Sequence, residues 1–330
     1  MQTVCVAVIT REVDENLFSL VQTLKSLSID KNRFRSEILV VINGSSTNLD
    51  LFDSRFGHLA GALPGVSRVF TSETGIPHAR NLALEWSIGA EFDWLAFIDA
   101  DCRPQDDWLH SLLGCAEQRH ALVVAGETRI EPATRPSLFV PESQWGIGAY
   151  RAWHFQEIKA GYLNTAYTRN VIFRPRHIAA IMQGGLRFDE PIPNGGGSDV
   201  VFFRKIHQQG TRIAFCPRAV VRETYSEKRL TYGWHFKRRI RNVQLGYLRG
   251  EDFAKILWSG FLAHGRQKYS EETDESPRVT RESSRSMAKL LGLLGEFGLS
   301  IAAAVGLISL FLGWRYSSYS DRWISYRRIH

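Results

Sequence analysis

The chain has 330 residues, and 44% of them are hydrophobic, which suffices for one large domain or for one domain with appendages. Its formal net charge of +7 and pI near 9.3 predict an anionic partner. The sequence shows no recognition helix, zinc finger or aromatic RNA-binding signature, so nucleic acid is excluded and a membrane surface or a phosphorylated substrate is favoured.

Cysteine usage and the N-terminus indicate a reducing compartment. The four cysteines lack paired Cys-x-x-Cys spacing and are expected to be reduced core thiols. Residues 1–10 lack the basic start and long apolar segment of a secretory signal and predict a first β-strand. We therefore expect the catalytic part to stay in the cytoplasm.

The first hundred residues predict alternating strands and helices. Strands are expected at 3–10, 37–43, near Phe70 and at 94–98, with helices at 14–28 and from a turn at 75–81 through Trp86. This alternation predicts an α/β fold with a mostly parallel sheet and helices on both of its faces.

Two carboxylates, Asp99 and Asp101, follow the strand at 94–98. If the strand continued, they would lie on one side, and Pro104 would stop the ladder behind them. Ligands bind at the carboxyl ends of parallel strands, and such a carboxylate pair suits Mg²⁺ or Mn²⁺ carrying a diphosphate. The alternative is a polar turn after a buried strand.

The middle of the chain alternates less regularly. The pattern predicts helices at 108–119, from Pro175 to Gly184-Gly185, from Ser198, and at 230–249, and strands at 122–126, 168–173 and 211–216. Residues 127–165, rich in aromatics and glycine, predict either a long excursion that holds a ligand or a packed segment.

Asp199 is a candidate catalytic base. Ser198 suits an N-cap, and a carboxylate in the first turn is favoured by the helix dipole, so capping alone would explain both residues. The preceding glycines, 195–197, instead indicate a backbone that approaches a ligand closely, where a carboxylate can act as a base. The residues leave both interpretations open.

The last hundred residues are basic and partly apolar. In the helix at 230–249, Trp234 and Arg238 share a face, which suits either a cationic clamp or a solvated surface. A polar linker is expected at 271–285. The uncharged stretch 297–314 has basic flanks and predicts a helix or hairpin in an anionic leaflet, with a buried core helix as the alternative.

Four ordered motifs resemble those of inverting family 2 glycosyltransferases with the GT-A fold. They are the opening strand and helix, Val40-Val41-Ile42-Asn43-Gly44-Ser45, the run Gly75-Ile76-Pro77-His78-Ala79-Arg80-Asn81 leading to Asp99-Ala100-Asp101, and Gly197-Ser198-Asp199 followed by the Trp234…Arg238 helix. Each motif alone is weak, but the ordered set, over about residues 3–245, is specific.

The resemblance implies a role for nine residues. Thr10 and Glu12 would lie by the nucleotide, Asn43 near its base or ribose, Arg80 near the diphosphate, Asp99 beside the ribose and Asp101 on a divalent metal, Mg²⁺ or Mn²⁺. Asp199 would be the general base, and Arg238 and Arg239 would contact the donor diphosphate or an acceptor's phosphates. Two positions depart from the family: Ile42 replaces an aspartate, and Ser198 replaces a glutamate.

The resemblance also implies an organisation and a reaction. Residues 1–250 would be a GT-A catalytic domain, 251–286 a basic and polar connecting segment, and 287–330 a membrane-associated helix or hairpin with a basic tail. The chain is similar to bacterial exopolysaccharide glucosyltransferases of the succinoglycan type. It would move one sugar from a nucleotide-sugar donor to a polyprenyl-diphosphate-linked or other saccharide acceptor, at the cytoplasmic face of the inner membrane.

Two other functions stay open as alternatives. A catalytically inactive GT-A subunit would be a structural partner in a polysaccharide assembly complex, and the retained Asp99, Asp101 and Asp199 argue against it. A nucleotidyltransferase would carry a glycine-rich basic loop after the first strand, where residues 10–14 are Thr-Arg-Glu-Val-Asp. The donor sugar, the acceptor and the oligomeric state are not readable from the sequence.

Overall fold

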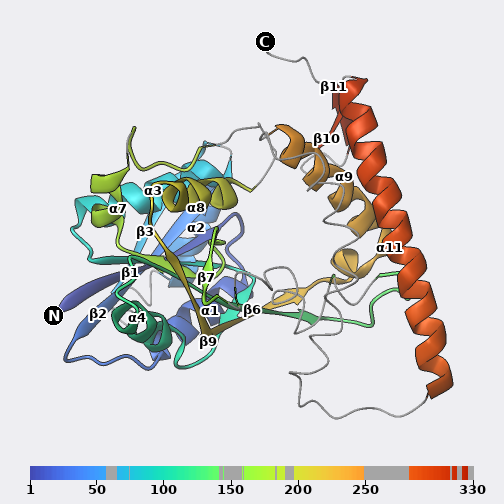
Figure 1. The fold of residues 1–330 in the computed structure, drawn as a ribbon. Coiled ribbons are helices and arrows are strands. Elements are labelled where there is room, and N and C mark those ends of the chain that lie inside the picture. The colour runs from blue at the N-terminus through green and yellow to red at the C-terminus, as the bar shows by residue number, and fades with distance from the viewer. Residues whose placement is uncertain are drawn as a thin grey trace. The chain divides into compact units, whose positions relative to one another are not determined.

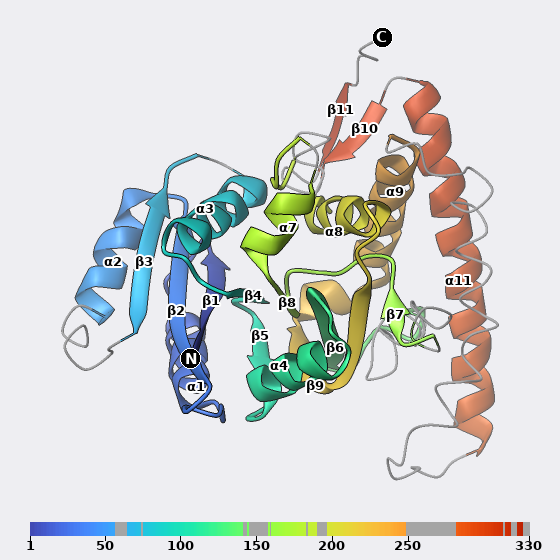
Figure 2. The same cartoon turned by 60° about the vertical axis from the view of Figure 1, so that its left-hand side comes forward.

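The computed structural model describes two compact units of an α/β protein. The described residues are 1–56, 65–73, 75–140, 144, 158, 160–182, 184–189, 197–248, 282–312, 314–317 and 322–325. The first unit comprises residues 1–128, 156–189 and 197–223, and the second comprises 129–155, 190–196 and 224–330. Both units are drawn in Figures 1 and 2.

The first half of the main sheet is parallel, as predicted. Its strands are β1 (Gln2–Thr10), β2 (Phe34–Asn43), β3 (Val66–Thr71) and β4 (Trp94–Asp99), in the order β3-β2-β1-β4. Helices α1 (Glu15–Ser26), α2 (Ser46–Phe56) and α3 (Ile76–Gly89) connect these strands (Figure 1). Helix α2 was not predicted from the sequence, because its residues show little amphipathic pattern.

The second half of the sheet is antiparallel, so the prediction of a mostly parallel sheet is wrong. The order continues through β8 (Val171–Phe173), β6 (Val123–Pro132), β9 (Ile213–Tyr225) and β5 (Cys102–Pro104), with β7 (Tyr162–Leu163) on β9. Strand β8 runs antiparallel to β4 and to β6, and β5 runs antiparallel to β9. Helices α4 (Trp108–Gln118), α7 (Pro175–Ile181) and α8 (Ser198–Gln208) complete this unit.

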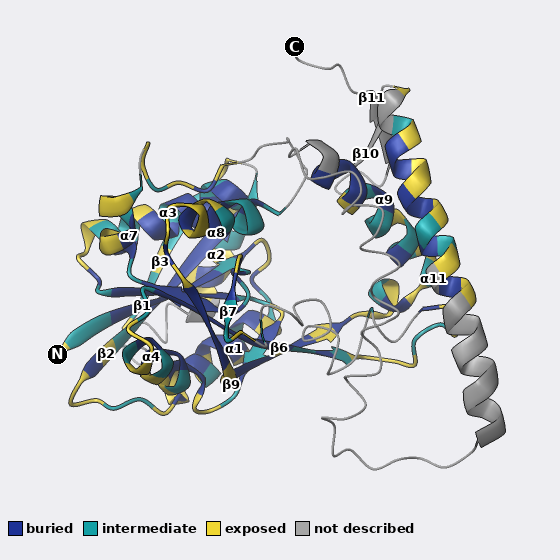
Figure 3. Cartoon of the chain, in the orientation of Figure 1, coloured by how far each residue is buried: buried dark blue, intermediate teal, exposed yellow. Residues whose placement is uncertain are grey.

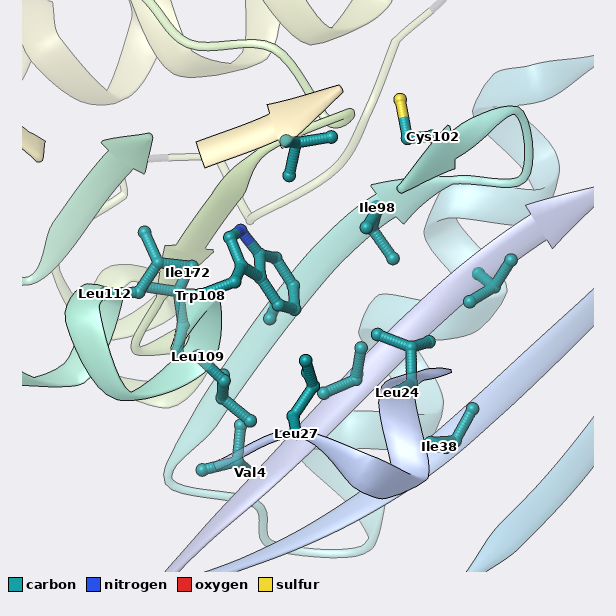
Figure 4. Packing of buried hydrophobic residues seen from close by; sticks show 14 of the residues in the cluster. Val4, Leu24, Leu27, Ile38, Ile98, Cys102, Trp108, Leu109, Leu112 and Ile172 are labelled. Atoms are coloured by element: carbon teal, nitrogen blue, oxygen red, sulfur yellow. The ribbon is translucent and has the colours of Figure 1, made fainter. Parts of the chain in front are cut away.

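The core of the first unit is built from the faces that the apolar spacing predicts. On α1, buried residues recur at three- and four-residue intervals, and the Asp14 side chain caps the helix by accepting from the Leu17 amide at 2.9 Å. These residues belong to one hydrophobic cluster, in which Trp108, Leu109 and Leu112 of α4 also pack with residues of the strands (Figure 4). The sheet edge that carries the candidate site is therefore held on a rigid layer.

The second unit contains a helix pair and a short hairpin. Its elements are η3 (Glu227–Leu230), α9 (Tyr232–Leu248), α11 (Glu282–Phe311), β10 (Trp314–Ser317) and β11 (Arg322–Ser325), with β10 antiparallel to β11. Among the described residues, no helix combines the length and the apolar character that crossing a membrane requires.

Glycines allow α9 and α11 to approach closely. A Cβ at Gly306 would lie 2.9 Å from the Ile240 carbonyl oxygen, and one at Gly298 would lie 2.0 Å from the Tyr232 hydroxyl. The Gln244 side chain crosses the interface and donates to Ser309 Oγ at 2.7 Å. Helix α11 is therefore fixed to α9 by one face.

Several predicted segments lie partly outside the described residues. These are residues 141–143, 145–157 and 159 of the aromatic segment 127–165, the glycines 195 and 196, most of the linker and connecting segment, 251–281, and the basic tail after residue 325. The basic helix predicted at 230–249 is confirmed as α9, and the apolar stretch at 297–314 is confirmed as helical up to Phe311.

Candidate active site

The carboxyl ends of the central parallel strands bring three predicted site residues to one edge of the sheet. In the strand register, Ile9 of β1 lies beside Asp99 of β4, and Thr10 lies beside Ile42 of β2. Asn43 is the next residue of β2, so Thr10, Asn43 and Asp99 are neighbours along this edge. The β-α-β order of the sequence produces this arrangement because parallel strands end on the same side.

Thr10 and Asn43 order the backbone around this edge. The Thr10 hydroxyl donates to the Glu12 carbonyl oxygen at 2.5 Å, which fixes the turn that carries the exposed Glu12 side chain. The Asn43 amide nitrogen donates at 2.6 Å to the carbonyl oxygen of Gly75, whose φ of 129° requires glycine. The buried Asn43 Oδ1 has no hydrogen-bond partner among the described residues. A polar ligand group is what would satisfy it.

Ile42 does not take part in the site. Its side chain is fully buried in the core of the first unit. Ile42, which stands where the family has an aspartate, therefore contributes to the packing of the core. It cannot make the polar contact that an aspartate side chain would make.

Asp99 ends β4, and Asp101 lies in a turn between β4 and β5. The expectation that Pro104 stops the ladder is wrong: Pro104 is the last residue of β5 and pairs with Val221 of β9. Asp101 is exposed, and it is not part of a strand that continues from Asp99. Asp99 at the end of β4 and Asp101 in the turn that follows it thus both lie at the carboxyl end of this strand.

The Asp99 carboxyl lies in a strongly acidic environment. Burial raises its pKa to about 7, and this is the largest effect on it. The positive charge of Arg80 lowers the pKa, whereas the negative charges of three nearby carboxylates raise it further, namely Asp101, Glu223 and Asp199. The described residues around Asp99 therefore carry an excess of negative charge that a cation would offset.

Arg80 connects the strand edge with the start of α8. Its Nη1 donates to Ser198 Oγ at 2.6 Å, and its Nη2 donates to Thr168 Oγ1. Nη2 also lies 3.6 Å from an Asp199 carboxylate oxygen. The guanidinium is buried, and its Nε has no partner among the described residues. The Arg80 guanidinium thus holds Asp199, the candidate base, in position and lowers the pKa of Asp99.

The start of α8 differs from the prediction in its cap. Gly197, with φ 76°, is the N-cap, and Ser198 is the first helical residue. The Ser198 hydroxyl accepts the Arg80 hydrogen bond, so the prediction of Ser198 as N-cap is wrong. Asp199 lies in the first turn, as predicted, and one of its oxygens accepts from the Val200 amide at 2.9 Å. Because its other oxygen faces Arg80, the carboxylate has a defined orientation.

A buried ion pair, which the sequence did not predict, lies beside this site. Arg169 Nη1 lies 3.1 Å from a Glu223 carboxylate oxygen, and the guanidinium stacks 4.7 Å from the Tyr167 ring centroid. Glu223 pairs with Cys102 in the β5–β9 register, which brings it next to the Asp99–Asp101 turn. The sequence offers little signal for this pair, because Arg169 stands between Thr168 and Asn170 and Glu223 stands between Arg222 and Thr224.

Arg238 and Arg239 lie on α9 of the second unit. The Arg238 guanidinium lies 4.9 Å from the Trp234 ring centroid, so the shared face predicted for these two residues is confirmed. Arg238 Nη1 also donates to the Tyr225 hydroxyl at 3.1 Å. A contact of Arg238 or Arg239 with a diphosphate stays a prediction.

The carboxylates of Asp99 and Asp101 are chemically suited to binding a hard divalent cation. Asp99 and Asp101 supply carboxylate oxygens, which Mg²⁺ and Mn²⁺ prefer, and the local excess of negative charge favours a cation. The described residues contain no group of three or more His, Cys, Asp and Glu side chains arranged to hold a metal ion. A cation here would therefore take further oxygens from a bound ligand or water.

Comparison with known proteins identifies similar sequences. The family model described as glycosyl transferase family 2 matches residues 5–184. The succinoglycan biosynthesis protein ExoM of Rhizobium meliloti (strain 1021) is 31% identical over 229 residues, which cover 68% of this chain and 69% of ExoM. A glucosyl-dolichyl phosphate glucuronosyltransferase of Haloferax volcanii is 24% identical over 210 residues, which span 60% of this chain and 62% of that relative.

Two solved structures share the fold. The mannosyltransferase PcManGT of Pyrobaculum calidifontis, in complex with GDP-Man and Mn²⁺, aligns with a TM-score of 0.57 and 18% identity over 92% of this chain and 86% of its own. GalNAc-T7, with UDP, GalNAc and Mn²⁺, aligns with a TM-score of 0.52 and 12% identity over 78% of this chain and 56% of its own. At these identities the likeness concerns the α/β fold with its mixed sheet.

Proposed function

Because the chain belongs to glycosyltransferase family 2, we propose that it transfers one sugar from a UDP-hexose to a hydroxyl group of a lipid-linked saccharide. The chain is a glycosyltransferase, and its similarity to ExoM supports a role in the synthesis of a cell-surface polysaccharide. The observation that carries the proposal is Arg80, whose guanidinium contacts Asp199 and lowers the pKa of Asp99. The base candidate and the strand-end carboxylate thus belong to one network.

Asp199 is the general base in this proposal. It takes the proton of the acceptor hydroxyl, and the hydroxyl oxygen attacks the anomeric carbon of the donor. The bond between that carbon and the diphosphate breaks, and its electron pair leaves with the diphosphate oxygen, which inverts the configuration. The contacts of Asp199 with Arg80 and with the Val200 amide would hold the carboxylate in place for the proton transfer.

The donor would bind along the sheet edge. The unsatisfied Asn43 Oδ1 supports a contact with the base or ribose, and the turn fixed by Thr10 would present Glu12 to the nucleotide. Asp99 would accept from a ribose hydroxyl. Arg238 and Arg239 would stabilise the diphosphate of the donor or the phosphates of the acceptor.

Asp101, with Asp99 beside it, would hold Mg²⁺ or Mn²⁺. When bound, such an ion supplies positive charge to the diphosphate as the sugar leaves. The excess of carboxylates around Asp99 supports this assignment.

We place the reaction at the cytoplasmic face of the inner membrane, where a polyprenyl-diphosphate-linked acceptor would be extended. The four cysteines are free thiols, which supports a reducing compartment. The basic charge of the chain supports contact with an anionic membrane surface.

A panel of nucleotide sugars tests the proposal. Purified protein is incubated with each sugar and Mn²⁺ or Mg²⁺, with and without membrane lipid extract, and release of nucleoside diphosphate is measured. We expect release from one donor, loss of release on chelation, and stimulation by lipid. Asp199→Asn should reduce turnover by about 10²-fold or more, the usual contribution of a general base.

Asp189→Asn is the matched control because Asp189 is an exposed carboxylate paired with Lys205. It should leave turnover unchanged. Absence of both nucleotide binding and release for every donor would contradict the proposal and favour an inactive structural partner. Full turnover in Asp199→Asn would remove Asp199 from the mechanism.

A further inference from the structure

A continuous apolar stripe runs along the outer side of α11. It consists of six residues at helical spacing, Leu294, Phe297, Ile301, Val305, Ile308 and Leu312, whose exposed fractions lie between 37% and 71%. Figure 3 shows exposed positions along this helix. The stripe extends for about 27 Å at the helical rise of 1.5 Å per residue. Soluble surfaces rarely expose apolar patches of this extent unless the patch is a site of interaction.

The opposite face of α11 is already used for packing within the second unit. Ala302 packs with Ile240, while Ala303 and Leu307 pack with Val243. Gly306 closes the approach to α9. Among the residues that the structure describes, α9 packs on this inner face and the six stripe residues are exposed, so we look for a different occupant of the stripe.

The basic residues that flank the stripe in the sequence indicate which occupant it has. Residues 282–330 contain six basic and three acidic residues, and residues 297–314, which include five of the six stripe residues, contain no charged residue. Trp314, which is exposed, stands at the end of the stripe, and Tyr316 pairs with Trp323 in the hairpin that follows. Apolar side chains with cationic and aromatic neighbours are typical of an element that lies in an anionic lipid interface.

A second copy of the chain fits the stripe less well. The seam of a helical dimer is usually flanked by charged residues that set the register and the partner. The sequence has no charged residue between Glu296 and Arg315.

We infer that α11 lies flat in the surface of an anionic membrane and inserts this stripe into the boundary of the acyl chains. The inference deepens the membrane location given under the proposed function, and its contact surface is defined independently of the reaction. The inner face stays on α9, so the helix serves as a platform that holds the second unit at the lipid surface.

Vesicle binding by the full chain tests the inference. Binding is measured by co-sedimentation with vesicles of phosphatidylcholine alone and of phosphatidylcholine with phosphatidylglycerol. We expect binding to the anionic vesicles, weaker binding at high salt, and at least a tenfold loss of affinity in the double variant Ile301→Gln/Ile308→Gln. The matched control, Leu51→Gln/Ile181→Gln, changes two apolar residues of similar exposure in the first unit and should bind like the unchanged chain.

A second measurement covers the case in which the double variant does not fold. An environment-sensitive fluorophore attached at Ile308→Cys should shift to the blue on anionic vesicles, whereas the same label at Ile181→Cys should not. Equal vesicle binding by the stripe variant and the unchanged chain would overturn the inference. A dimer that dissociates in the stripe variant, with vesicle binding unaffected, would identify a second copy as the occupant. Donor turnover is scored separately, so loss of turnover with stripe-dependent binding would refute only the proposed reaction.

Discussion

Replacing Arg80 by lysine should disrupt the candidate site while keeping its positive charge. The contacts of Arg80 come from two nitrogen atoms: Nη1 reaches Ser198, and Nη2 reaches Thr168 and Asp199. The charge of a lysine ammonium is on one nitrogen atom, which cannot reach all three partners of the planar guanidinium. At least one buried hydrogen bond to a charged group is lost, at a cost of about 1.5–3 kcal/mol. Misplacement of Asp199 should also lower turnover by about 10²-fold.

Arg68→Lys provides the control for this prediction. Arg68 makes a bidentate ion pair with Asp53, but both side chains are largely exposed. Such a pair contributes about 0–1 kcal/mol, so the substitution should have little effect. Urea unfolding followed by tryptophan fluorescence gives the stability, and nucleoside diphosphate release gives the turnover. Equal effects of Arg80→Lys and Arg68→Lys on both quantities would refute the central position of Arg80.

Two further predictions concern the second unit and helix packing. Burial, followed by the charge of Arg238, lowers the pKa of His235 to about 4, below the value of about 6.5 in an unfolded chain. The unfolded state then binds more protons between these pH values, so stability should fall by up to about 3 kcal/mol as the pH drops from 6.5 to 4. Urea midpoints across this range should fall less in His235→Phe, and an unchanged slope would contradict the assignment. Gly306→Ala should destabilise the chain because the added Cβ would meet the Ile240 carbonyl oxygen. Gly114→Ala is the control, since its Cβ would enter open space and should stabilise the helix by up to about 1 kcal/mol. Thermal unfolding of the two variants measures this difference.

The parallel half of the fold follows directly from the sequence because each strand and helix there is local and periodic. The strands ending at Thr10, Asn43 and Asp99 were predicted to within three residues of their ends. The antiparallel half depends on pairings between distant segments, which periodicity does not encode. Strand β9 was expected to end at residue 216, before Pro217, yet it continues to Tyr225 with two successive exposed positions after Cys216.

The site residues divide in the same way. Asp99, Asp101 and Asp199 are recognisable from short motifs, and Arg80 from its place in one of them. The partners of Arg80 are not recognisable, because Thr168 lies 88 residues away and Ser198 lies 118 residues away. The Arg169–Glu223 pair was missed for the same reason, since nothing near either residue in the sequence indicates its partner.

The pairing of β5 with β9 has a consequence for when the site forms. Cys102, one residue after Asp101, pairs with Glu223, so the turn that carries the two carboxylates is closed by a strand more than a hundred residues later. Closing such a long loop is slow compared with forming the local β-α-β units. During synthesis on the ribosome, the parallel strands could therefore assemble early, whereas the carboxylate turn would become ordered only after Glu223 had left the exit tunnel.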